Sequence, residues 1–262
     1  MTSLPSTSIP ELSVVAPMFN EAGGARALVA EIAAALTGLD HEIIVVDDCS
    51  TDATFEELSA AQQDAPQLRI LAHGANAGQS RAIHTGVVAA RAPLVAMIDG
   101  DGQNDPADIP ALLAALENAP DAVRMAAGER RERNDPASKQ WASRMANGVR
   151  RRILRDGAAD TGCGLKVFDR ETFLALPYFD HMHRYLPALM ARAGASVVFC
   201  PVGHRARRHG VSKYNNIGRF AVAIRDILGV SWLLARARPP GVITEKTPTK
   251  EVRVAQDCDR IE

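Results

Sequence analysis

Two carboxylates separated by one glycine follow an apolar run near the middle of the chain. Asp99, Gly100 and Asp101 come directly after residues 94–98, which read Leu-Val-Ala-Met-Ile, and no lysine or arginine stands beside them. Two like charges that close together repel each other, and Mg²⁺ or Mn²⁺ bound to carboxylate oxygens, water and phosphate would relieve this. The pair therefore indicates a divalent metal that holds a phosphate-bearing ligand. The alternative is that both residues cap the turn before a helix near Pro106.

Polar residues also follow two earlier apolar runs. Residues 16–21 read Ala-Pro-Met-Phe-Asn-Glu, and residues 47–52 read Asp-Asp-Cys-Ser-Thr-Asp. A carboxylate at a strand end can accept hydrogen bonds from the ring N–H of a base or from ribose hydroxyls. Helix capping by Ser50, Thr51 or Asp52 accounts for part of the later cluster. Since the chain shows neither G-x-G-x-x-G after its first strand nor a P-loop pattern, a dinucleotide cofactor and a P-loop site are both disfavoured.

The first half of the chain contains the strand and helix patterns that would hold these residues in place. Short β-branched runs alternate with Ala- and Leu-rich helical patterns, which is typical of a parallel sheet covered by helices. The expected strands are Leu12–Ala16, Glu42–Asp47, Leu68–Ala72, Leu94–Ile98 and Ala122–Ala127, and the expected helices are Glu21–Leu36, Asp52–Gln63, Gln79–Arg91 and Pro106–Glu117. Ligands of such sheets bind at the carboxyl ends of the strands, so the three polar clusters should meet at one edge.

The second half of the chain is less regular. It suggests a basic helix over 138–154, a Gly-rich turn over 160–164, strands near 165–168 and 196–201, and an amphipathic helix from residue 217 onward. Basic residues crowd two segments: Arg130, Arg131, Arg133, Lys139, Arg144, Arg150, Arg151, Arg152 and Arg155, and then Arg205, Arg207, Arg208, Lys213 and Arg219. For Arg150 to Arg152 a solvated helix face or contact with lipid headgroups is expected.

Composition excludes several classes of protein. With 262 residues, 47% of them hydrophobic, and a net charge of −1, the chain should form a sizeable core and has no overall attraction to nucleic acid. Its four cysteines are too widely spaced for a zinc knuckle or a disulfide framework. No signal peptide is expected, and the apolar run over 221–235, interrupted by Arg225 and Asp226, is too short to cross a bilayer. We therefore expect a cytoplasmic protein, peripheral to a membrane at most.

Several ordered motifs resemble those of the family 2, GT-A-fold glycosyltransferases. They are Val14–Glu21, Glu42–Asp52, Asn76–Ser80 and Asp99–Gln103. Later stretches, at 128–130, 160–166 and 204–214, resemble the dolichol-phosphate mannosyltransferase branch, whose bacterial members load glucose, aminoarabinose or galacturonic acid onto polyprenyl phosphate. The resemblance extends from about Leu12 to about Trp232. It implies an α/β fold with a Rossmann-like, mostly parallel sheet flanked by helices, followed by a C-terminal amphipathic helical segment.

The resemblance also implies roles for individual residues. It implies a GDP- or UDP-sugar donor, inversion at the anomeric carbon, and Mg²⁺ or Mn²⁺ held by Asp101 with Asp99 and Gln103. The implied nucleotide-sugar site consists of Pro17, Asn20, Glu21, Asp48, Asp99, Gly100 and Gln103. Catalytic roles fall on Asp101, on Arg130 and, as a hypothesis, on Asp160, which would orient the acceptor or the sugar.

The expected acceptor is polyprenyl phosphate. A phosphate monoester has a second pKa of about 6 and is largely a dianion at neutral pH, so it needs no strong general base. Arginine and lysine must hold it beside an anionic donor. The expected acceptor and diphosphate site is Arg205, Arg207, Ser212 and Lys213. The product would be a lipid-linked sugar for the cell envelope, made at the inner face of the cell membrane.

Two other functions stay open. A family 2 transferase with a hydroxyl acceptor would need a general base, and a non-catalytic nucleotide-sugar or nucleic-acid binder would use the basic segments alone. The chain also departs from the family pattern, because Gly100 stands where alanine is common and Gly102 where leucine is common. We expect residues 1–10 to be flexible, 11–215 to form the catalytic domain and 239–262 to be disordered. Residues 216–238 are expected to face a membrane or a partner protein, with a helix packed on the core as the alternative.

Overall fold

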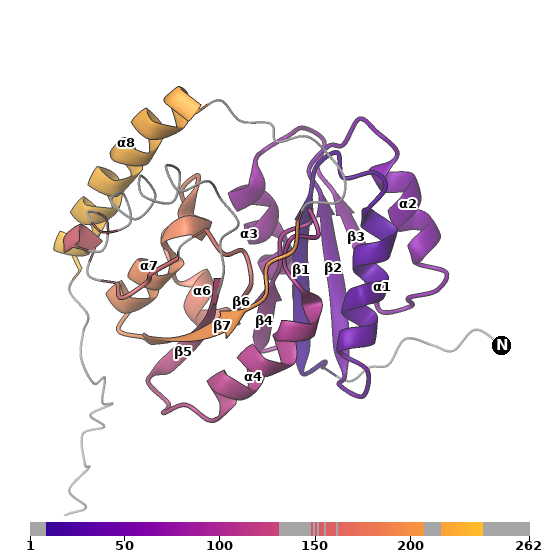
Figure 1. Ribbon diagram of the computed structural model, residues 1–262, viewed down its shortest axis with the longest axis horizontal. Helices are drawn as coiled ribbons and strands as arrows, with labels where there is room; N and C mark the ends of the chain where they lie inside the picture. Colours follow the sequence, from indigo (N-terminus) through magenta and orange to yellow (C-terminus); the bar gives the residue numbers. More distant parts are fainter. Residues whose placement is uncertain are drawn as a thin grey trace, which may run out of the picture.

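A computed structural model describes residues 9–130, 148, 150, 152–154, 156–160, 162–206 and 216–237. At its centre lies a seven-stranded sheet with the strand order β3-β2-β1-β4-β6-β5-β7 (Figure 1). The strands are β1 (Leu12–Met18), β2 (His41–Asp47), β3 (Leu68–Ala72), β4 (Leu94–Met97), β5 (Val123–Arg130), β6 (Lys166–Asp169) and β7 (Ser196–Val202). The α-helices are α1 (Ala25–Ala35), α2 (Thr54–Ala61), α3 (Gln79–Ala89), α4 (Ile109–Glu117), α6 (Arg170–Leu174), α7 (Leu186–Arg192) and α8 (Asn216–Ala235), and the 3₁₀-helices are η1 (Pro106–Asp108) and η2 (Met182–Tyr185).

The strand β1 occupies the middle of the parallel part of the sheet. It pairs in parallel with β2 on one side and with β4 on the other, and all seven of its residues are buried. The chain thus moves outward from β1 through β2 and β3 and then returns to the other side of β1 with β4. This reversal opens a crevice at the carboxyl ends of β1 and β4, which is where ligands bind in open α/β sheets.

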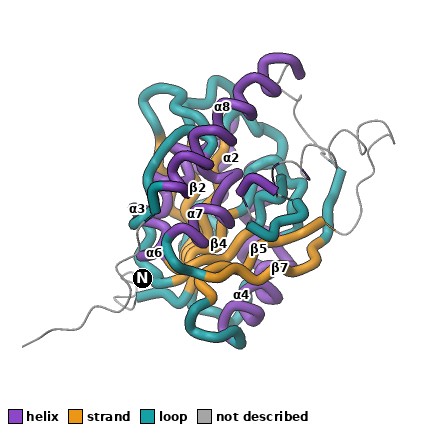
Figure 2. The backbone as a smooth tube through the Cα atoms, turned by 90° about the vertical axis from the view of Figure 1, so that its left-hand side faces the viewer, coloured by secondary structure: helices purple, strands orange, loops and turns teal. Residues whose placement is uncertain are grey.

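Helices cover both faces of the sheet, because alternate residues of the central strands point to opposite sides. Val14 and Ala16 of β1 pack in one apolar cluster with α1, α2 and α4, whereas Val15 packs in a second cluster with α3, α6 and α7. Figure 2 shows α4 on one side of β5 and β7, with α7 on the other. The predicted fold class, a mostly parallel α/β sheet flanked by helices, is therefore confirmed.

The predicted elements of the first half are present with shifted ends. The helix expected from Glu21 begins only at Ala25, because Asn20 and Gly23 adopt positive φ angles of 54° and 88° that an α-helix cannot contain. The strands β6 and β7 lie where they were expected, but β6 runs antiparallel to β4 and β5. The helices α6 and α7 were not predicted. Most of the basic helix expected over 138–154 lies outside the described residues.

The last described element, α8, packs on the second apolar cluster through one side only. Val230 is buried there, whereas Ile224, Leu228 and Trp232 keep 46%, 64% and 59% of their surface exposed. The helix is held by Arg192, whose Nε donates to the carbonyl of Leu233 at 3.1 Å. Among the described helices, none has the length and apolar content needed to cross a bilayer.

Candidate active site

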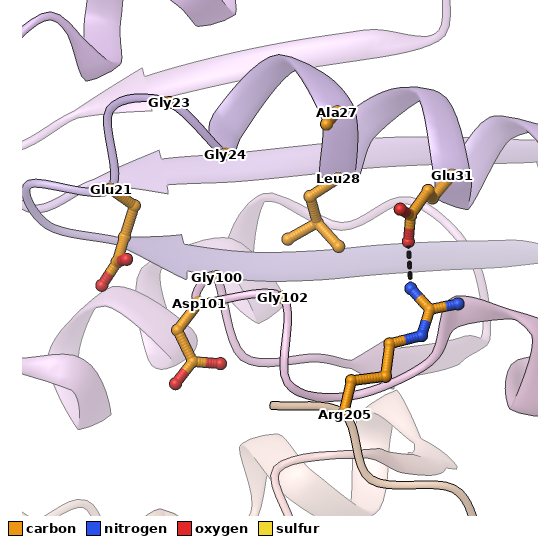
Figure 3. A pocket seen from close by; sticks show the side chains of 10 residues that line it. All are labelled: Glu21, Gly23, Gly24, Ala27, Leu28, Glu31, Gly100, Asp101, Gly102 and Arg205. Carbon is orange, nitrogen blue, oxygen red and sulfur yellow. Dashed lines mark hydrogen bonds and ion pairs between the residues drawn. The ribbon is translucent and has the colours of Figure 1, made fainter. Parts of the chain in front are cut away.

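A pocket opens at the carboxyl ends of β1 and β4, where the strand order reverses. It is lined by Glu21, Gly23, Gly24, Ala27, Leu28, Glu31, Gly100, Asp101, Gly102 and Arg205. These residues come from the loop after β1, from the start of α1, from the loop after β4 and from the segment after β7. In Figure 3 the carboxyl groups of Glu21 and Asp101 point into the same region of this pocket. The site is therefore rich in carboxylate oxygens.

The two carboxylates of the Asp-Gly-Asp motif have different surroundings. Asp101 lines the pocket, and its Oδ1 accepts a hydrogen bond from the backbone N–H of Gln103 at 3.1 Å. Asp99 instead points toward α3, where its Oδ1 accepts from Gln79 Nε2 at 2.7 Å. Burial and then repulsion from Asp101 raise the pKa of Asp99 to about 6. A divalent cation beside the pair would offset that repulsion.

Glycine at position 100 has a steric cause. A Cβ atom there would overlap the carbonyl oxygen of Pro17 and would come within 2.7 Å of Met18 Cγ. The loop after β4 therefore lies directly against the end of β1, which brings Pro17 close to the acidic pair. Pro17 itself stays buried. At Gly102 the φ angle is +70°, a conformation that a leucine would adopt only with strain. Both departures from the family pattern thus fit the local backbone.

The carboxylate of Asp48 is engaged within the protein. It is buried, and it accepts from His73 Nδ1 at 2.7 Å and from the backbone N–H groups of Ala77 and Gly78 at 2.9 and 2.8 Å. These bonds fix the loop between β3 and α3. The structure therefore gives Asp48 a role in shaping that loop, and contact with a nucleoside stays a prediction.

Asn20 ties the loop after β1 to the loop after β2. Its backbone N–H donates to Ser50 Oγ at 2.9 Å, and its Oδ1 accepts from the backbone N–H of Thr51 at 2.7 Å. The next residue, Glu21, donates its backbone N–H to Thr54 Oγ1 at 2.9 Å and turns its side chain into the pocket. Two of the three polar clusters expected at this edge are thus joined directly. Asp52 accepts from the N–H of Thr54, although Ala53 occupies the N-cap position of α2.

Arg130 and Asp160, both predicted to act in catalysis, contact each other. Arg130 Nε lies 2.5 Å from Asp160 Oδ2, and Arg130 Nη2 lies 2.8 Å from Asp160 Oδ1. The hydrogen bond that Arg130 donates to Asp160 raises the pKa of Arg130, which stays positively charged. Gly162, two residues after Asp160, lies so close to the guanidinium that an added Cβ would come within 2.7 Å of Nη2. The positive charge of Arg130 also acts to lower the pKa of Asp99, which connects the pair to the acidic site.

Lys166 is a site residue that the sequence reasoning missed. It begins β6, it is 2% exposed, and its ammonium group donates to the carbonyl of Cys163. Burial lowers the pKa of Lys166, while the neighbouring charges of Asp99 and Asp160 act in the opposite direction. A lysine at the start of a short strand is ordinarily exposed. Its position in the Gly-Leu-Lys motif is therefore the one sequence feature that could have indicated a role for Lys166 in the site.

Arg205, predicted to bind the acceptor or the diphosphate, forms two ion pairs inside the protein. Its guanidinium lies 2.5 Å from Glu31 Oε2 and 2.7 Å from Asp105 Oδ1, and its backbone N–H donates to Gln103 O at 2.8 Å. Arg205 therefore links the segment after β7 to α1 and to the loop after Asp101. The other three residues predicted for that site, Arg207, Ser212 and Lys213, lie outside the described residues.

Arg150 does not occupy either of the environments expected for the basic segment. Its side chain is 6% exposed, and it forms an ion pair with the fully buried carboxylate of Asp156. The expectation of a solvated or lipid-facing arginine is therefore wrong at this position. Its neighbour Arg151 lies outside the described residues.

The oxygen donors at the pocket suit a hard divalent cation. Within the described part of the chain, no group of three or more His, Cys, Asp or Glu side chains forms a complete metal site. A pair of carboxylates that leaves positions for water and phosphate is nevertheless the arrangement that Mg²⁺ uses with phosphorylated ligands. Burial raises the pKa of Asp99 and repulsion from Asp101 raises it further, and a bound cation would relieve that repulsion. The residues present therefore fit such an ion.

Comparison with known proteins agrees with this geometry. Residues 13–176 match the model of the glycosyl transferase family 2. The chain is 37% identical over 237 residues to a dodecaprenyl-phosphate galacturonate synthase of Rhizobium johnstonii, with 88% of this chain and 69% of that protein covered. It is 32% identical over 210 residues to an undecaprenyl-phosphate 4-deoxy-4-formamido-L-arabinose transferase of Edwardsiella ictaluri, with 79% and 64% covered. The chain thus spans about two thirds of the length of these relatives.

Solved structures share the fold at lower identity. A glucosyl-3-phosphoglycerate synthase from Mycobacterium tuberculosis, in complex with Mn²⁺, uridine diphosphate and glucosyl-3-phosphoglycerate, superposes with a TM-score of 0.65 at 19% identity, covering 88% of this chain and 81% of that one. A mannosyltransferase from Pyrobaculum calidifontis, in complex with GDP-mannose and Mn²⁺, gives a TM-score of 0.62 at 20% identity, covering 87% and 65%. Together with the family match and the 37% identity, the acidic pair at the switch point identifies the chain as a member of glycosyl transferase family 2.

Proposed function

We propose that this protein transfers a sugar, with inversion, from a GDP- or UDP-sugar to polyprenyl phosphate, and so makes a lipid-linked sugar for the cell envelope. The observation that carries the proposal is the Asp99–Asp101 pair at the carboxyl end of β4, with Arg130 of the Arg130–Asp160 pair near enough for its charge to act on Asp99. The names of the two relatives, which are 37% and 32% identical, support the acceptor class. Which sugar and which nucleotide are used depends on the pocket shape formed by several loops.

The donor half of the site would work by balancing negative charge. Asp101, Asp99 and the amide oxygen of Gln103 would hold Mg²⁺ or Mn²⁺, which would supply positive charge at the departing diphosphate. Arg130 adds a fixed guanidinium, whose orientation is set by the two bonds to Asp160. The Mn²⁺ and nucleotide bound in the two structural neighbours support this arrangement. Glu21 and Asn20, which border the pocket and its neighbouring loop, would contact the nucleoside together with Pro17, Gly100 and Asp48.

The acceptor half needs positive charge more than it needs a base. A phosphate dianion is already nucleophilic at neutral pH, so no proton has to be removed in the transfer step. Asp160 is bound on both oxygens by Arg130, which suits a residue that orients the guanidinium rather than one that abstracts a proton. We assign the acceptor phosphate to Arg207, Ser212 and Lys213, with Arg205 anchoring the start of their segment.

The exposed side of α8 would place the enzyme at the membrane. Ile224, Leu228 and Trp232 follow one another at intervals of four residues, so they lie on one face of the helix. Arg225 is exposed on the same helix and Arg236 is exposed just after its end, where the Arg236 guanidinium lies 5.3 Å from the Trp232 ring centre. An apolar stripe bordered by arginine suits the interface of an anionic membrane. The enzyme would therefore act peripherally, at the cytoplasmic face, where its lipid acceptor resides.

One experiment tests the donor and the acceptor together. The purified protein is incubated with Mn²⁺, undecaprenyl phosphate and a panel of GDP- and UDP-sugars, and the lipid fraction is analysed by mass spectrometry. A glycosylated lipid phosphate would establish the reaction and name the sugar. Metal-dependent donor hydrolysis without a lipid product would instead favour the hydroxyl-acceptor alternative, and the absence of any donor turnover or binding would favour a non-catalytic binder.

A further inference from the structure

We infer that Gln79 is a positioning residue, which orients the first carboxylate of the Asp99–Asp101 pair for the divalent cation. The inference rests on the proposed function, because it concerns the cation site of the same enzyme. It starts from the 2.7 Å hydrogen bond between Gln79 Nε2 and Asp99 Oδ1. That bond occupies one carboxylate oxygen of Asp99. The other oxygen is therefore the one available to a cation. Because the amide of Gln79 is uncharged, it orients Asp99 without competing for the metal, as a further carboxylate would.

Gln79 is itself held firmly from two sides. The backbone N–H groups of the two preceding residues, Ala77 and Gly78, both donate to the buried carboxylate of Asp48. The next residue, Ser80, is buried, and its Oγ lies 2.7 Å from His183 Nδ1. Gln79 is also the first residue of α3, so its backbone is continuous with a regular helix. The amide group therefore reaches Asp99 from a rigid base.

One face of the Asp99 carboxylate is covered by Gly164. A Cβ atom at position 164 would overlap both carboxylate oxygens and the carboxylate carbon of Asp99. The carboxylate thus lies directly on the glycine backbone, and no other residue type leaves it room. Lys166 holds this turn in place by donating to the carbonyl of Cys163, the residue before Gly164. The charge of Lys166 also favours the ionised form of Asp99.

These contacts connect the segment that follows β2 with the segment that follows β4. Asp48, which follows β2, fixes the loop between β3 and α3. Gln79, which follows that loop, orients Asp99 at the end of β4. Residues that hold a metal ligand in its productive orientation typically contribute about 10- to 100-fold to metal affinity. The amide of Gln79 should therefore affect the binding of a cation that it does not touch.

The test measures Mn²⁺ binding alone, by electron paramagnetic resonance of the free ion, with no nucleotide or lipid present. Gln79→Met keeps the length and the helix propensity of the side chain but removes its donor. We expect it to weaken Mn²⁺ binding by about 10- to 100-fold with an unchanged melting temperature. Gln63→Met is the matched control, since Gln63 is exposed, follows α2 and does not line the pocket. An unchanged Mn²⁺ affinity in Gln79→Met would overturn the inference.

A double-mutant cycle shows whether Gln79 acts through Asp99. In an Asp99→Ala background, Gln79→Met should have no further effect on Mn²⁺ binding, because the group that it orients is gone. An equal loss in both backgrounds would overturn the inference. Gly164→Ala, which displaces Asp99 without altering Gln79, should weaken Mn²⁺ binding similarly, whereas Gly74→Ala, with open space at its Cβ, should not. If Gln79→Met proves unfolded, Gln79→Leu, which also lacks the amide donor, takes its place in both backgrounds of the cycle.

The outcomes separate this inference from the proposed function. Failure to glycosylate undecaprenyl phosphate would remove the proposed acceptor and leave the Mn²⁺ result unaffected. Loss of Mn²⁺ binding in Asp101→Ala with normal binding in Gln79→Met would overturn only the positioning role. Absence of Mn²⁺ binding in the unaltered protein would overturn the proposed cation site and this inference together.

Discussion

Arg130 and Asp160 face each other through two parallel hydrogen bonds, of 2.5 and 2.8 Å, although thirty residues separate them in the chain. Such a two-point contact fixes the plane of the guanidinium as well as its position. Both side chains are mostly buried, with 14% and 10% of their surface exposed, so solvent screens the pair only weakly. The contact makes Arg130 a rigid positive group at the edge of the acidic site.

The first prediction concerns this pair. Arg130→Gln should lower kcat by roughly 10²–10³-fold, as removal of a fixed donor from a developing negative charge does in other enzymes. Asp160→Asn should cause a smaller loss, because Arg130 remains but is less firmly oriented. If Asp160 acts only through Arg130, the double variant should be no slower than Arg130→Gln. Steady-state kinetics with the identified donor and acceptor would measure all three.

An exposed pair of the same type serves as the control for Arg130. Arg26 and Asp64 lie 2.6 Å apart, with 59% and 67% of their side chains exposed. Arg26→Gln should leave kcat unchanged, since exposed ion pairs contribute little and Arg26 does not line the pocket. A double variant of Arg130 and Asp160 that is much slower than Arg130→Gln would show that Asp160 has a separate catalytic role.

The second prediction concerns the cation. Asp101→Ala should abolish Mn²⁺-dependent binding of UDP and GDP and leave the fold intact, because Asp101 lines the pocket and supports no packed core. Isothermal titration with and without Mn²⁺ would measure the affinity, and circular dichroism would check the fold. Asp64→Ala, an exposed carboxylate elsewhere, should behave as the unaltered protein. Equal nucleotide affinity with and without Mn²⁺ in both the variant and the unaltered protein would refute the metal assignment.

The first half of the fold could be predicted from local patterns alone. The strands β1, β2, β3 and β4 are mostly apolar runs between helical segments, so a few consecutive residues are enough to predict each strand. The placement of Asp99 and Asp101 follows from the rule for carboxyl ends of parallel strands and needs no distant contact. The family motifs add the chemistry expected there.

The second half depends on contacts between distant residues. β6 enters the sheet between β4 and β5, and this pairing, rather than its own sequence, decides that Lys166 is buried. Arg205 was expected to bind phosphate because of its motif, but Glu31, 174 residues away, compensates its charge. Likewise, glycine is required at position 164 because of its contact with Asp99, which is distant in the sequence. No local pattern carries information of this kind.

The third prediction concerns stability and pH. Glu42 is buried in β2, and burial alone would raise its pKa, but hydrogen bonds from Ser13, from the backbone N–H of Arg91 and from Arg69 together lower the pKa below its ordinary value of 4.5. A carboxyl group with a lowered folded-state pKa stabilises the fold above the pKa of the unfolded chain. This stabilisation should disappear as the pH falls below about 4.5 and through the folded-state value.

Comparison with Glu42→Gln isolates this contribution. At pH 7 the variant should lose roughly 1–3 kcal/mol in its free energy of unfolding, since charged hydrogen bonds to Ser13, Arg69 and Arg91 are replaced by weaker ones. Urea unfolding between pH 7 and pH 3 would show the difference between the two proteins shrinking at the acidic end. A difference that stays constant over this range would mean that the charge of Glu42 does not stabilise the fold.

The last prediction concerns the exposed side of α8. If Leu228 and Trp232 enter a lipid interface, replacing either with glutamate should weaken binding to vesicles of phosphatidylglycerol by about tenfold or more, because burial of one such side chain contributes about 1.5–3 kcal/mol. Co-sedimentation with vesicles would measure the bound fraction. Phe55→Glu is the matched control: Phe55 is 45% exposed on α2, which lies at the other end of the molecule from α8 in Figure 1, so vesicle binding should not change. Equal binding of all the variants would indicate that this stripe contacts a protein instead of lipid.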